Sequence, residues 1–170
     1  MLVAITGHES GLGKALYNVF DNTLGFDITN GYDINNYLQI LDEADHCDVF
    51  INNAYSGFSQ VNLLEELFNR WRNSNKIIVN ISSVAPNYNT DYETFRLYPT
   101  HKLALDDACY RLQGISKSCK VINIKPHFID TNMSKEFEGE KLDPLYVATE
   151  IKEIVLTKNN LTTVVINQKL

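Results

Sequence analysis

The sequence predicts one α/β domain in which helices cover both faces of a parallel sheet. Short β-type runs alternate with amphipathic segments of helix length, and several of the β-type runs are almost continuously apolar. Such runs are typical of strands buried on both faces, and the alternation is typical of a doubly wound sheet. The length of 170 residues suits a single domain, and no repeat or linker interrupts the sequence. We therefore expect a three-layer α/β/α domain over residues 1–170, with six or seven parallel strands.

Six segments have the composition of buried strands. Each is short, rich in apolar and β-branched residues, and bounded by polar or turn-forming residues. We expect strands at residues 1–6, 24–28, 47–52, 76–82, 119–124 and 162–167. The segment GYDI, residues 31–34, is a candidate for a very short seventh strand.

Helical segments are expected between these strands. Leu64, Phe68 and Trp71 recur at helical spacing in one of them. Asp143 at an N-cap and Pro144 at the first helical position give the last one a clear start. We expect helices at residues 12–20, 35–45, 60–72, 97–114 and from 144 onward.

The charge balance excludes some classes of partner. The 15 lysines and arginines against 21 aspartates and glutamates give a formal net charge of −6. The charge balance therefore gives no indication that the protein binds nucleic acid or an anionic membrane. No apolar run approaches the ~20 residues of a membrane-spanning helix. We expect neither nucleic acid nor a membrane as a partner.

The start of the chain and its cysteines favour a cytoplasmic protein. The first residues, MLVAITG, lack the basic region of a signal peptide, and their apolar stretch ends within a few residues. Cys47, Cys109 and Cys119 are odd in number and lack metal or redox spacing, which fits a reducing compartment. The histidines are scattered along the chain, so we expect no metal site.

Three glycines lie between the first predicted strand and the first predicted helix. Gly7, Gly11 and Gly13 stand in the sequence VAITGHESGLGKAL. The first glycine permits a tight turn, and the others let a pyrophosphate and the helix approach closely. The phosphates would then lie at the positive end of the helix. A simple strand–helix turn is the alternative, but the position after a strand and before a helix favours a phosphate-binding loop.

A tyrosine and a lysine lie four residues apart in the sequence RLYPTHKLAL. Pro99 would break the interior of a helix, but a first turn tolerates it, because its missing N–H has no intrahelical partner there. We therefore expect the helix to begin near Arg96 or Leu97, with Tyr98 and Lys102 on one face. A cation one turn away would lower the pKa of the Tyr98 phenol and make it a usable base near neutral pH.

The spacing T-G-x-x-x-G-x-G resembles the short-chain dehydrogenase/reductase family, in its compact branch. Further motifs of that family occur in the expected order, and the resemblance covers almost the whole chain. They are an N-N-A-G-like motif at Asn52, Asn53 and Ala54, an asparagine at Asn62, a serine at Ser83, the Y-x-x-x-K pair Tyr98 and Lys102, and a P-G-x-x-x-T-like motif at Pro126 and Thr131. Two positions depart from the pattern, because Tyr55 and His127 stand where the family has glycine.

The resemblance implies a Rossmann-type domain and an NAD(P)-dependent oxidoreductase that acts on a small carbonyl or alcohol compound. It makes Tyr98 the general acid and base, and it implies that Lys102 also bonds the nicotinamide ribose. It further implies that Ser83 polarises the substrate oxygen and that Asn62 holds a water molecule in the proton relay.

The resemblance also implies how the chain holds its cofactor. We favour NAD slightly over NADP, because Asp27 near the end of the second predicted strand can accept the ribose 2′-hydroxyl and repel a 2′-phosphate. Thr29 or Asn30 could occupy that position instead. Asp33 resembles an aspartate that contacts adenine, although both aspartates could simply form turns. The implied cofactor contacts are Thr6, Gly7, Ser10, Gly11, Leu12, Gly13, Asp27, Asp33, Asn53, Ala54, Tyr98, Lys102, Pro126, Ile129 and Thr131.

The chain is shorter than most members of that family. The helix after the second strand is expected to be absent, and the segment 132–142 is too short for much of a substrate lid. We therefore expect an open pocket, or one completed by a partner subunit. The resemblance implies a homodimer or homotetramer through residues 60–72 and 97–114, where an exposed region at Phe68 and Trp71 could serve as the interface.

Two other functions stay open at this point. A cofactor-binding sensor or scaffold with little turnover is favoured by the short lid and by Tyr55 and His127. The complete set of Ser83, Tyr98 and Lys102 argues against it. Epimerase or dehydratase chemistry also uses Y-x-x-x-K, but nucleotide-sugar substrates need a larger C-terminal part than this sequence provides.

Overall fold

A six-stranded parallel sheet forms the centre of the protein, as the sequence predicts. The computed structural model describes residues 1–87, 96–157 and 160–167. Its strands are β1 (Val3–Thr6), β2 (Thr23–Phe26), β3 (Val49–Asn52), β4 (Ile77–Ile81), β5 (Lys120–Pro126) and β6 (Thr163–Ile166). All neighbouring strands are parallel, in the order β2-β1-β3-β4-β5-β6. The chain winds outward in both directions from β1 and β3, and ligands of doubly wound sheets bind at the carboxyl ends of strands at such a point.

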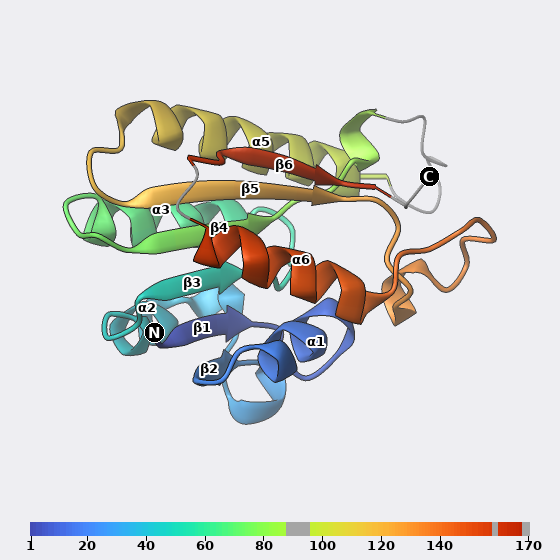
Figure 1. Ribbon diagram of the computed structural model, residues 1–170, viewed down its shortest axis with the longest axis horizontal. Helices are drawn as coiled ribbons and strands as arrows, with labels where there is room; N and C mark the ends of the chain where they lie inside the picture. Colours follow the sequence, from blue (N-terminus) through green and yellow to red (C-terminus); the bar gives the residue numbers. More distant parts are fainter. Residues whose placement is uncertain (88–95, 158–159, 168–170) are drawn as a thin grey trace.

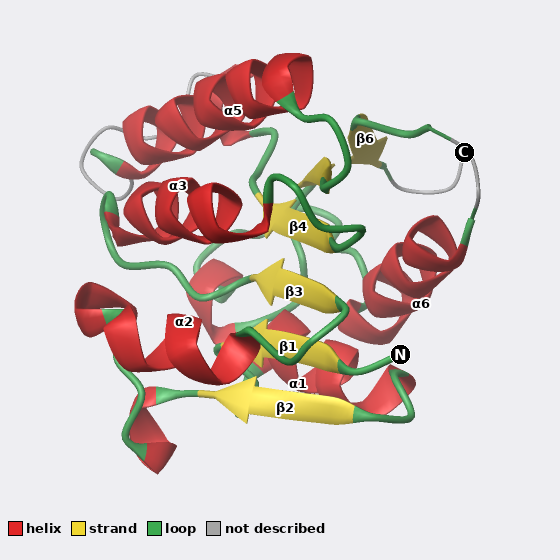
Figure 2. Cartoon of the chain, turned by 90° about the vertical axis from the view of Figure 1, so that its left-hand side faces the viewer, coloured by secondary structure: helices red, strands yellow, loops and turns green. Residues whose placement is uncertain are grey.

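Helices cover both faces of this sheet. They are α1 (Gly11–Val19), α2 (Leu38–Ala44), α3 (Ser59–Trp71), α5 (Tyr98–Ile115) and α6 (Pro144–Leu156). Figure 2 shows α2, α3 and α5 on one face, with α1 and α6 on the other. In Figure 1 the arrowheads of the strands point toward the edge where the orange segment before α6 lies. None of the described helices is long and apolar enough to cross a membrane.

Two helices begin where their prolines predict. Helix α5 starts at Tyr98, so Pro99 lies in its first turn and removes no helical hydrogen bond. Asp143 caps α6, because its carboxylate accepts a hydrogen bond of 2.8 Å from the backbone N–H of Leu145. The start of α5 places the Tyr98 phenol at the positive end of a helix, where negative charge is favoured.

Apolar side chains form one core on each face of the sheet. Successive strand residues alternate between them, so Ala4 packs beneath α2, α3 and α5 while Val3 and Ile5 pack beneath α1 and α6. All three side chains are almost completely buried. The sheet is therefore covered on both faces, as its continuous apolar strands predict.

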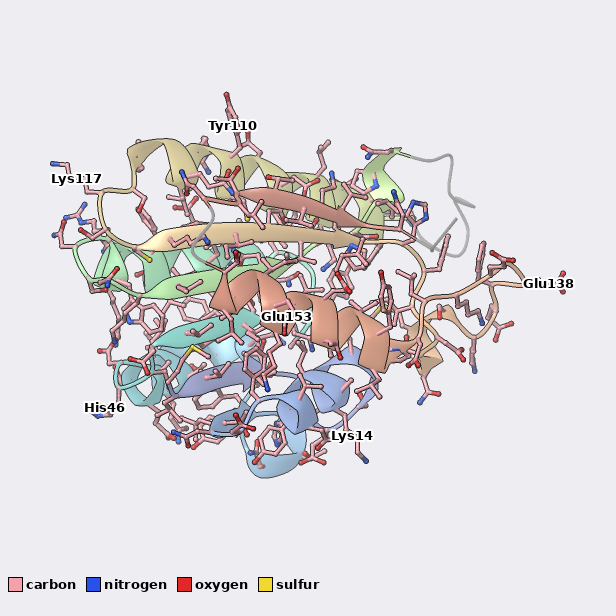
Figure 3. All side chains as sticks on the ribbon, viewed as in Figure 1. Lys14, His46, Tyr110, Lys117, Glu138 and Glu153 are labelled. Atoms are coloured by element: carbon pink, nitrogen blue, oxygen red, sulfur yellow. The ribbon has the colours of Figure 1, made fainter. Side chains whose placement is uncertain are left out.

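The predicted exposure of Phe68 and Trp71 is wrong. Their exposed fractions are 4% and 2%, because both lie on the inner face of α3. The Trp71 ring packs edge-on against Phe50, with 6.4 Å between ring centroids. The exposed apolar side chains of α5 include Leu103 and Tyr110, and Figure 3 shows Tyr110 projecting from the outer side of the molecule. An oligomer through α3 and α5 stays a prediction.

The predicted seventh strand at residues 31–34 is also wrong. Two single 3₁₀ turns, η1 (Ile28–Asn30) and η2 (Ile34–Asn36), occupy this part of the chain. The carboxylate of Asp27 accepts the backbone N–H of Thr29, and that of Asp33 accepts the backbone N–H of Asn35. These local bonds compete with strand pairing and bend the chain twice. The expected absence of a regular helix directly after β2 is confirmed, and β2 forms an edge of the sheet.

Candidate functional site

A cavity of about 360 Å³ lies where the loops that follow the strands meet. Its lining comes from the segments after β1, β3, β4 and β5 and from the first turns of α1 and α5. The predicted site residues in this lining are Gly7, Ser10, Gly11, Leu12, Gly13, Asn53, Ala54, Ser83, Tyr98, Lys102, Pro126, Ile129 and Thr131. The structure therefore brings most of the predicted residues together around one space.

The glycine loop, residues 7–13, brings a helix N-terminus against the cavity. Gly7 and Gly11 have φ angles of 71° and 51°, in the left-handed region that favours glycine. A Cβ atom on Gly13 would lie 1.8 Å from the carbonyl oxygen of Gly7, so only glycine lets the helix pack this close to the strand. The first-turn N–H groups of α1 have no acceptor within the helix. Since Ser10 and Gly11 line the cavity, this loop fits the pyrophosphate of a dinucleotide.

Thr6 supports the glycine loop from below and does not line the cavity. It is fully buried, and its Oγ1 accepts hydrogen bonds from the backbone N–H groups of Asn53 at 2.9 Å and Ala54 at 3.0 Å. The Asn53 side-chain amide donates in return to the carbonyl oxygen of Thr6, at 2.9 Å. These bonds fix the loop after β3 against the end of β1. Thr6 therefore holds the segment after β3 against the end of β1, although the prediction made it a direct cofactor contact.

Tyr98 and Ser83 form a hydrogen-bonded pair at the cavity. The Ser83 hydroxyl oxygen also accepts the backbone N–H of Ala85, at 3.0 Å, which leaves its proton for Tyr98. Burial raises the pKa of Tyr98 to about 12, against the opposing effect of the Ser83 hydrogen bond. The phenol is therefore protonated at neutral pH and suited to donate a proton.

Lys102 is almost completely buried beside this pair, with an exposed fraction of 3%. Its ammonium group donates to Oε1 of Gln60 at 2.8 Å and to the carbonyl oxygen of Ile81 at 2.7 Å. Burial lowers the pKa of Lys102 to about 7, while the Asp106 carboxylate opposes this shift. Burial therefore disfavours the ammonium form of Lys102, and the negative charge of Asp106 favours it.

The expected lowering of the Tyr98 pKa by Lys102 is wrong. Nζ of Lys102 lies 5.4 Å from the centroid of the Tyr98 ring, and its hydrogen bonds go to Gln60 and Ile81. Burial acts on both groups and disfavours both charges, so the pKa of the tyrosine rises and that of the lysine falls.

Gln60, and not Asn62, is the α3 side chain that contacts Lys102 at the site. The Asn62 side chain is exposed and does not line the cavity, so its assignment to the proton relay does not fit. Gln60 is 2% exposed, and its amide donates to the carbonyl oxygens of Asn52 at 2.7 Å and Ile81 at 3.1 Å. Residues two apart on a helix point in different directions, so the two side chains cannot exchange roles.

Tyr55 covers the part of the cavity that Tyr98 and Lys102 line. Its ring meets that of Tyr98 edge-on, with 4.9 Å between centroids, and Nζ of Lys102 lies 5.4 Å from its centroid. The Tyr55 hydroxyl is hydrogen-bonded to Nδ1 of His101 at 2.8 Å, which fixes the ring. The position where the family motif has glycine thus carries a side chain that packs against Tyr98 at the cavity.

The adenosine side of the expected site lies outside this cavity. Asp27 directly follows β2, as predicted, but its carboxylate also bonds the hydroxyl of Thr29 at 3.0 Å. Asp33 caps η2 and does not line the cavity. The ring of His8 is buried against β2, where a Cβ atom on Gly25 would come within 2.4 Å of it. This side of the site is therefore formed by turns and by a packed histidine.

A short segment after β5 closes the cavity from the other side. His127 and Phe128 line it, and the ring of Phe128 stacks on Phe137 with 3.7 Å between centroids. Residues 129 and 142 form an isolated parallel bridge that closes this segment into a loop. Figure 3 shows Glu138 at its tip, far from the sheet. Residues 132–142 lie in this short loop, and the expectation that they provide little of a substrate lid stays a prediction.

Comparisons with solved structures show the same fold at low sequence identity. A 4-hydroxyisoleucine dehydrogenase complexed with NADH superposes with a TM-score of 0.80 at 19% identity, over 98% of this chain and 96% of that one. A short-chain dehydrogenase from Burkholderia cenocepacia in complex with NADP gives 0.78 at 17%, over 98% and 88%. Serine dehydrogenase from Escherichia coli gives 0.75 at 16%, over 98% and 97%. No protein-family model and no curated protein sequence matches the chain. The chain therefore has the fold of the short-chain dehydrogenases.

Proposed function

We propose that this protein is an NAD(P)-dependent oxidoreductase that transfers a hydride between a nicotinamide and a small carbonyl or alcohol compound. One observation carries the proposal: a single cavity is lined by the glycine loop and by Ser83, Tyr98 and Lys102. These groups come from separate segments, and their combination is what carbonyl reduction needs. The solved structures of similar fold add support, since they include dehydrogenases in complex with NADH or NADP.

The cofactor would be held mainly by main-chain groups. The first turn of α1 at Ser10 and Gly11 would bind the pyrophosphate, and Lys102 would bond the nicotinamide ribose. Asp27 would accept the 2′-hydroxyl of the adenosine ribose and repel a 2′-phosphate. Glu9 adds a second, exposed carboxylate in the glycine loop, beside His8. We therefore propose NAD as the preferred cofactor.

The bound nicotinamide supplies or accepts the hydride, and the residues of this chain handle the proton. In reduction, the protonated Tyr98 phenol gives its proton to the oxygen of the substrate as negative charge develops there. The Ser83 hydroxyl stabilises the tyrosinate that remains, because it is already hydrogen-bonded to that oxygen. The Lys102 ammonium, held by Gln60, adds a positive charge near the ring. The raised pKa of Tyr98 favours reduction over oxidation at neutral pH.

A cofactor-binding sensor with little turnover is the second candidate. The observation that favours it is the Tyr55 ring, which packs against Tyr98 and narrows the approach to its hydroxyl. Such a protein would bind the dinucleotide through the same glycine loop. The two candidates therefore differ in turnover and agree in cofactor binding.

The test is to incubate the purified protein with NADH and with NADPH against a panel of aldehydes, ketones and quinones. Loss of the absorbance of the reduced nicotinamide would report turnover and identify the cofactor. Tyr98→Phe should lower turnover by about 10²- to 10⁴-fold without changing the cofactor Kd. Tyr110→Phe is the matched control, because Tyr110 is an exposed tyrosine on the same helix. Binding without turnover would favour the sensor, and a fully active Tyr98→Phe would overturn the mechanism.

A further inference from the structure

A largely buried ion pair lies next to the cavity residues Ser82 and Pro126 and is not part of the motifs that identify the site. Asp106 on α5 and Lys125 on β5 are 2.7 Å apart, and their side chains are 14% and 13% exposed. The Asp106 carboxylate also accepts the hydroxyl of Ser82 at 2.6 Å and the side-chain amide of Asn123 at 2.8 Å. We call Ser82, Asp106, Asn123 and Lys125 the ion-pair cluster.

The ion-pair cluster touches the site through three elements. Ser82 lines the cavity and directly precedes Ser83, and Lys125 directly precedes the cavity residue Pro126. Asp106 follows Lys102 by one helical turn, so the two side chains share a face of α5. Ser82 is thus itself a cavity residue, Lys125 is next to one in the chain, and Asp106 is hydrogen-bonded to Ser82, while Asn123 reaches the cavity residues only through Asp106.

The negative charge of Asp106 also raises the pKa of Lys102 and so favours its ammonium form. The hydrogen-bond acceptors of Lys102, on Gln60 and Ile81, are neutral. The titratable groups that face it from the packed elements are Asp106 and Cys109 on its own helix and the phenols of Tyr98 and Tyr55. Burial raises the pKa of Cys109 and of both tyrosines, so these three are neutral near pH 7.

Buried ion pairs are weak contributors to stability, because the loss of hydration offsets much of their attraction. A role in setting the charge of a neighbouring group accounts for this pair better than stability does. Lys125 affects the same balance in the opposite sense, because its positive charge neutralises part of the field of Asp106 at Lys102.

We propose that Asp106 is a positioning residue that keeps Lys102 in its ammonium form, and that Lys125 moderates this effect. The inference rests on the proposed function in one respect, namely that the Lys102 ammonium group assists proton transfer by Tyr98. The electrostatic coupling itself concerns only the residues of this chain. It can therefore be measured without a substrate.

The experiment is a pH titration of Lys102 followed by the ¹³Cε chemical shift of labelled lysine, assigned with Lys102→Met. Asp106→Asn should lower the titration midpoint of Lys102 by about one pH unit, and Lys125→Gln should raise it by a similar amount. The double variant should fall between them. Asp107→Asn is the matched control, because Asp107 is 67% exposed and pairs with Arg111 at the surface. It should leave the midpoint unchanged.

Opposite shifts in the two single variants support the proposal, whereas shifts in one direction or no shift would overturn it. If Asp106→Asn fails to fold, the upward shift in Lys125→Gln and its reversal in the double variant still decide the question. The pH profile of NADH oxidation should move in parallel with the titration. A wild-type protein without turnover would remove the proposed function and leave the titration result standing.

Discussion

The glycine loop and the ion-pair cluster serve the same cavity, but they are built in different ways. The loop is local in sequence, and it acts through backbone N–H groups and through the absence of side chains at Gly7, Gly11 and Gly13. The cluster joins α5 to the ends of β4 and β5 through charged and polar side chains. Its geometry depends on three elements that meet only in the folded chain.

The glycine loop therefore depends on how closely two backbone segments pack, whereas the ion-pair cluster depends on the charges of its side chains. A close approach of two backbones tolerates no added atom, so the loop should respond steeply to small changes in volume. The charges of Lys102, Asp106 and Lys125 are coupled, so the catalytic side should respond to pH and to changes of charge at constant volume. The following predictions test that division, from the largest expected effect to the smallest.

Gly13→Ala should have the largest effect. The added Cβ would lie 1.8 Å from the carbonyl oxygen of Gly7, so the loop or the helix must move. We expect a loss of about 3 kcal/mol or more in the free energy of unfolding, measured in urea, together with loss of dinucleotide affinity. Gly114→Ala is the control, because a Cβ there meets nothing within 4 Å. It should leave stability unchanged or raise it by up to about 1 kcal/mol. Equal effects of the two changes would contradict the tight fit.

Asp106→Asn should destabilise the protein by about 3 kcal/mol, because it leaves the Lys125 cation buried without its partner. Replacing both partners, as Asp106→Leu with Lys125→Met, should cost much less, because no uncompensated charge then remains. Urea unfolding of the wild type, the single variant and the double variant gives the comparison. A double variant less stable than the single one would show that the pair itself stabilises the fold.

The ratio of alcohol oxidation to carbonyl reduction should rise about tenfold per pH unit between pH 7 and 9. Oxidation needs the tyrosinate form of Tyr98, whose fraction grows tenfold per unit below a pKa of about 12. Reduction needs the protonated form, which predominates throughout this range. Initial rates in both directions, with one alcohol–carbonyl pair, measure this ratio. A ratio that levels off near pH 8 would mean that the phenol titrates much lower than its burial indicates.

The stability of the wild type relative to Lys102→Met should rise with pH between about 7 and 9. The pKa of Lys102 is lowered in the folded protein to about 7, so above that value the unfolded chain binds more protons. The difference in unfolding free energy should therefore change by up to about 1.4 kcal/mol per pH unit. Lys117→Met, at an exposed lysine shown in Figure 3, should give no such slope. A flat difference for both variants would mean that Lys102 is not buried as a free amine.

The parts of the fold that depend on local chemistry could be predicted from the sequence. The strand–glycine–helix order placed the loop after β1, and Pro99 placed the start of α5 near Arg96 or Leu97, next to the observed start at Tyr98. The prediction of a strand at residues 31–34 was wrong, also for a local reason. Asp27 and Asp33 accept hydrogen bonds from nearby backbone N–H groups and form turns. A strand-like composition could not outweigh two Asx-type bonds of this kind.

The surroundings of Tyr98 and Lys102 could not be predicted, because they depend on burial and helix faces that a linear motif does not contain. Asn62 has the residue type that the motif requires, but it lies on the solvent-exposed face of α3. The periodicity held the missed signal, because Gln60 lies three, four and seven residues before the buried Leu63, Leu64 and Leu67. A polar residue on such an apolar face indicates a buried partner.

Another missed signal lay in the strands themselves. Asn52, Asn80 and Asn123 occupy one level across β3, β4 and β5, and each is at most 2% exposed. Asparagines in otherwise apolar strands indicate a buried polar layer near the carboxyl ends, where a site is expected. The pKa values of Tyr98 and Lys102 depend on the burial of these two side chains, and the spacing of residues in a motif does not reveal how deeply a side chain is buried.

The contact between His8 and Gly25 restricts how this sequence can evolve. A side chain at position 25 would collide with the imidazole ring, and the ring fills the space that the glycine leaves. The residues at positions 8 and 25 therefore constrain each other, because alanine at position 25 requires the His8 ring to move or to be replaced by a smaller side chain. Since residue 8 lies inside the glycine loop, a substitution at this position of β2 also disturbs that loop.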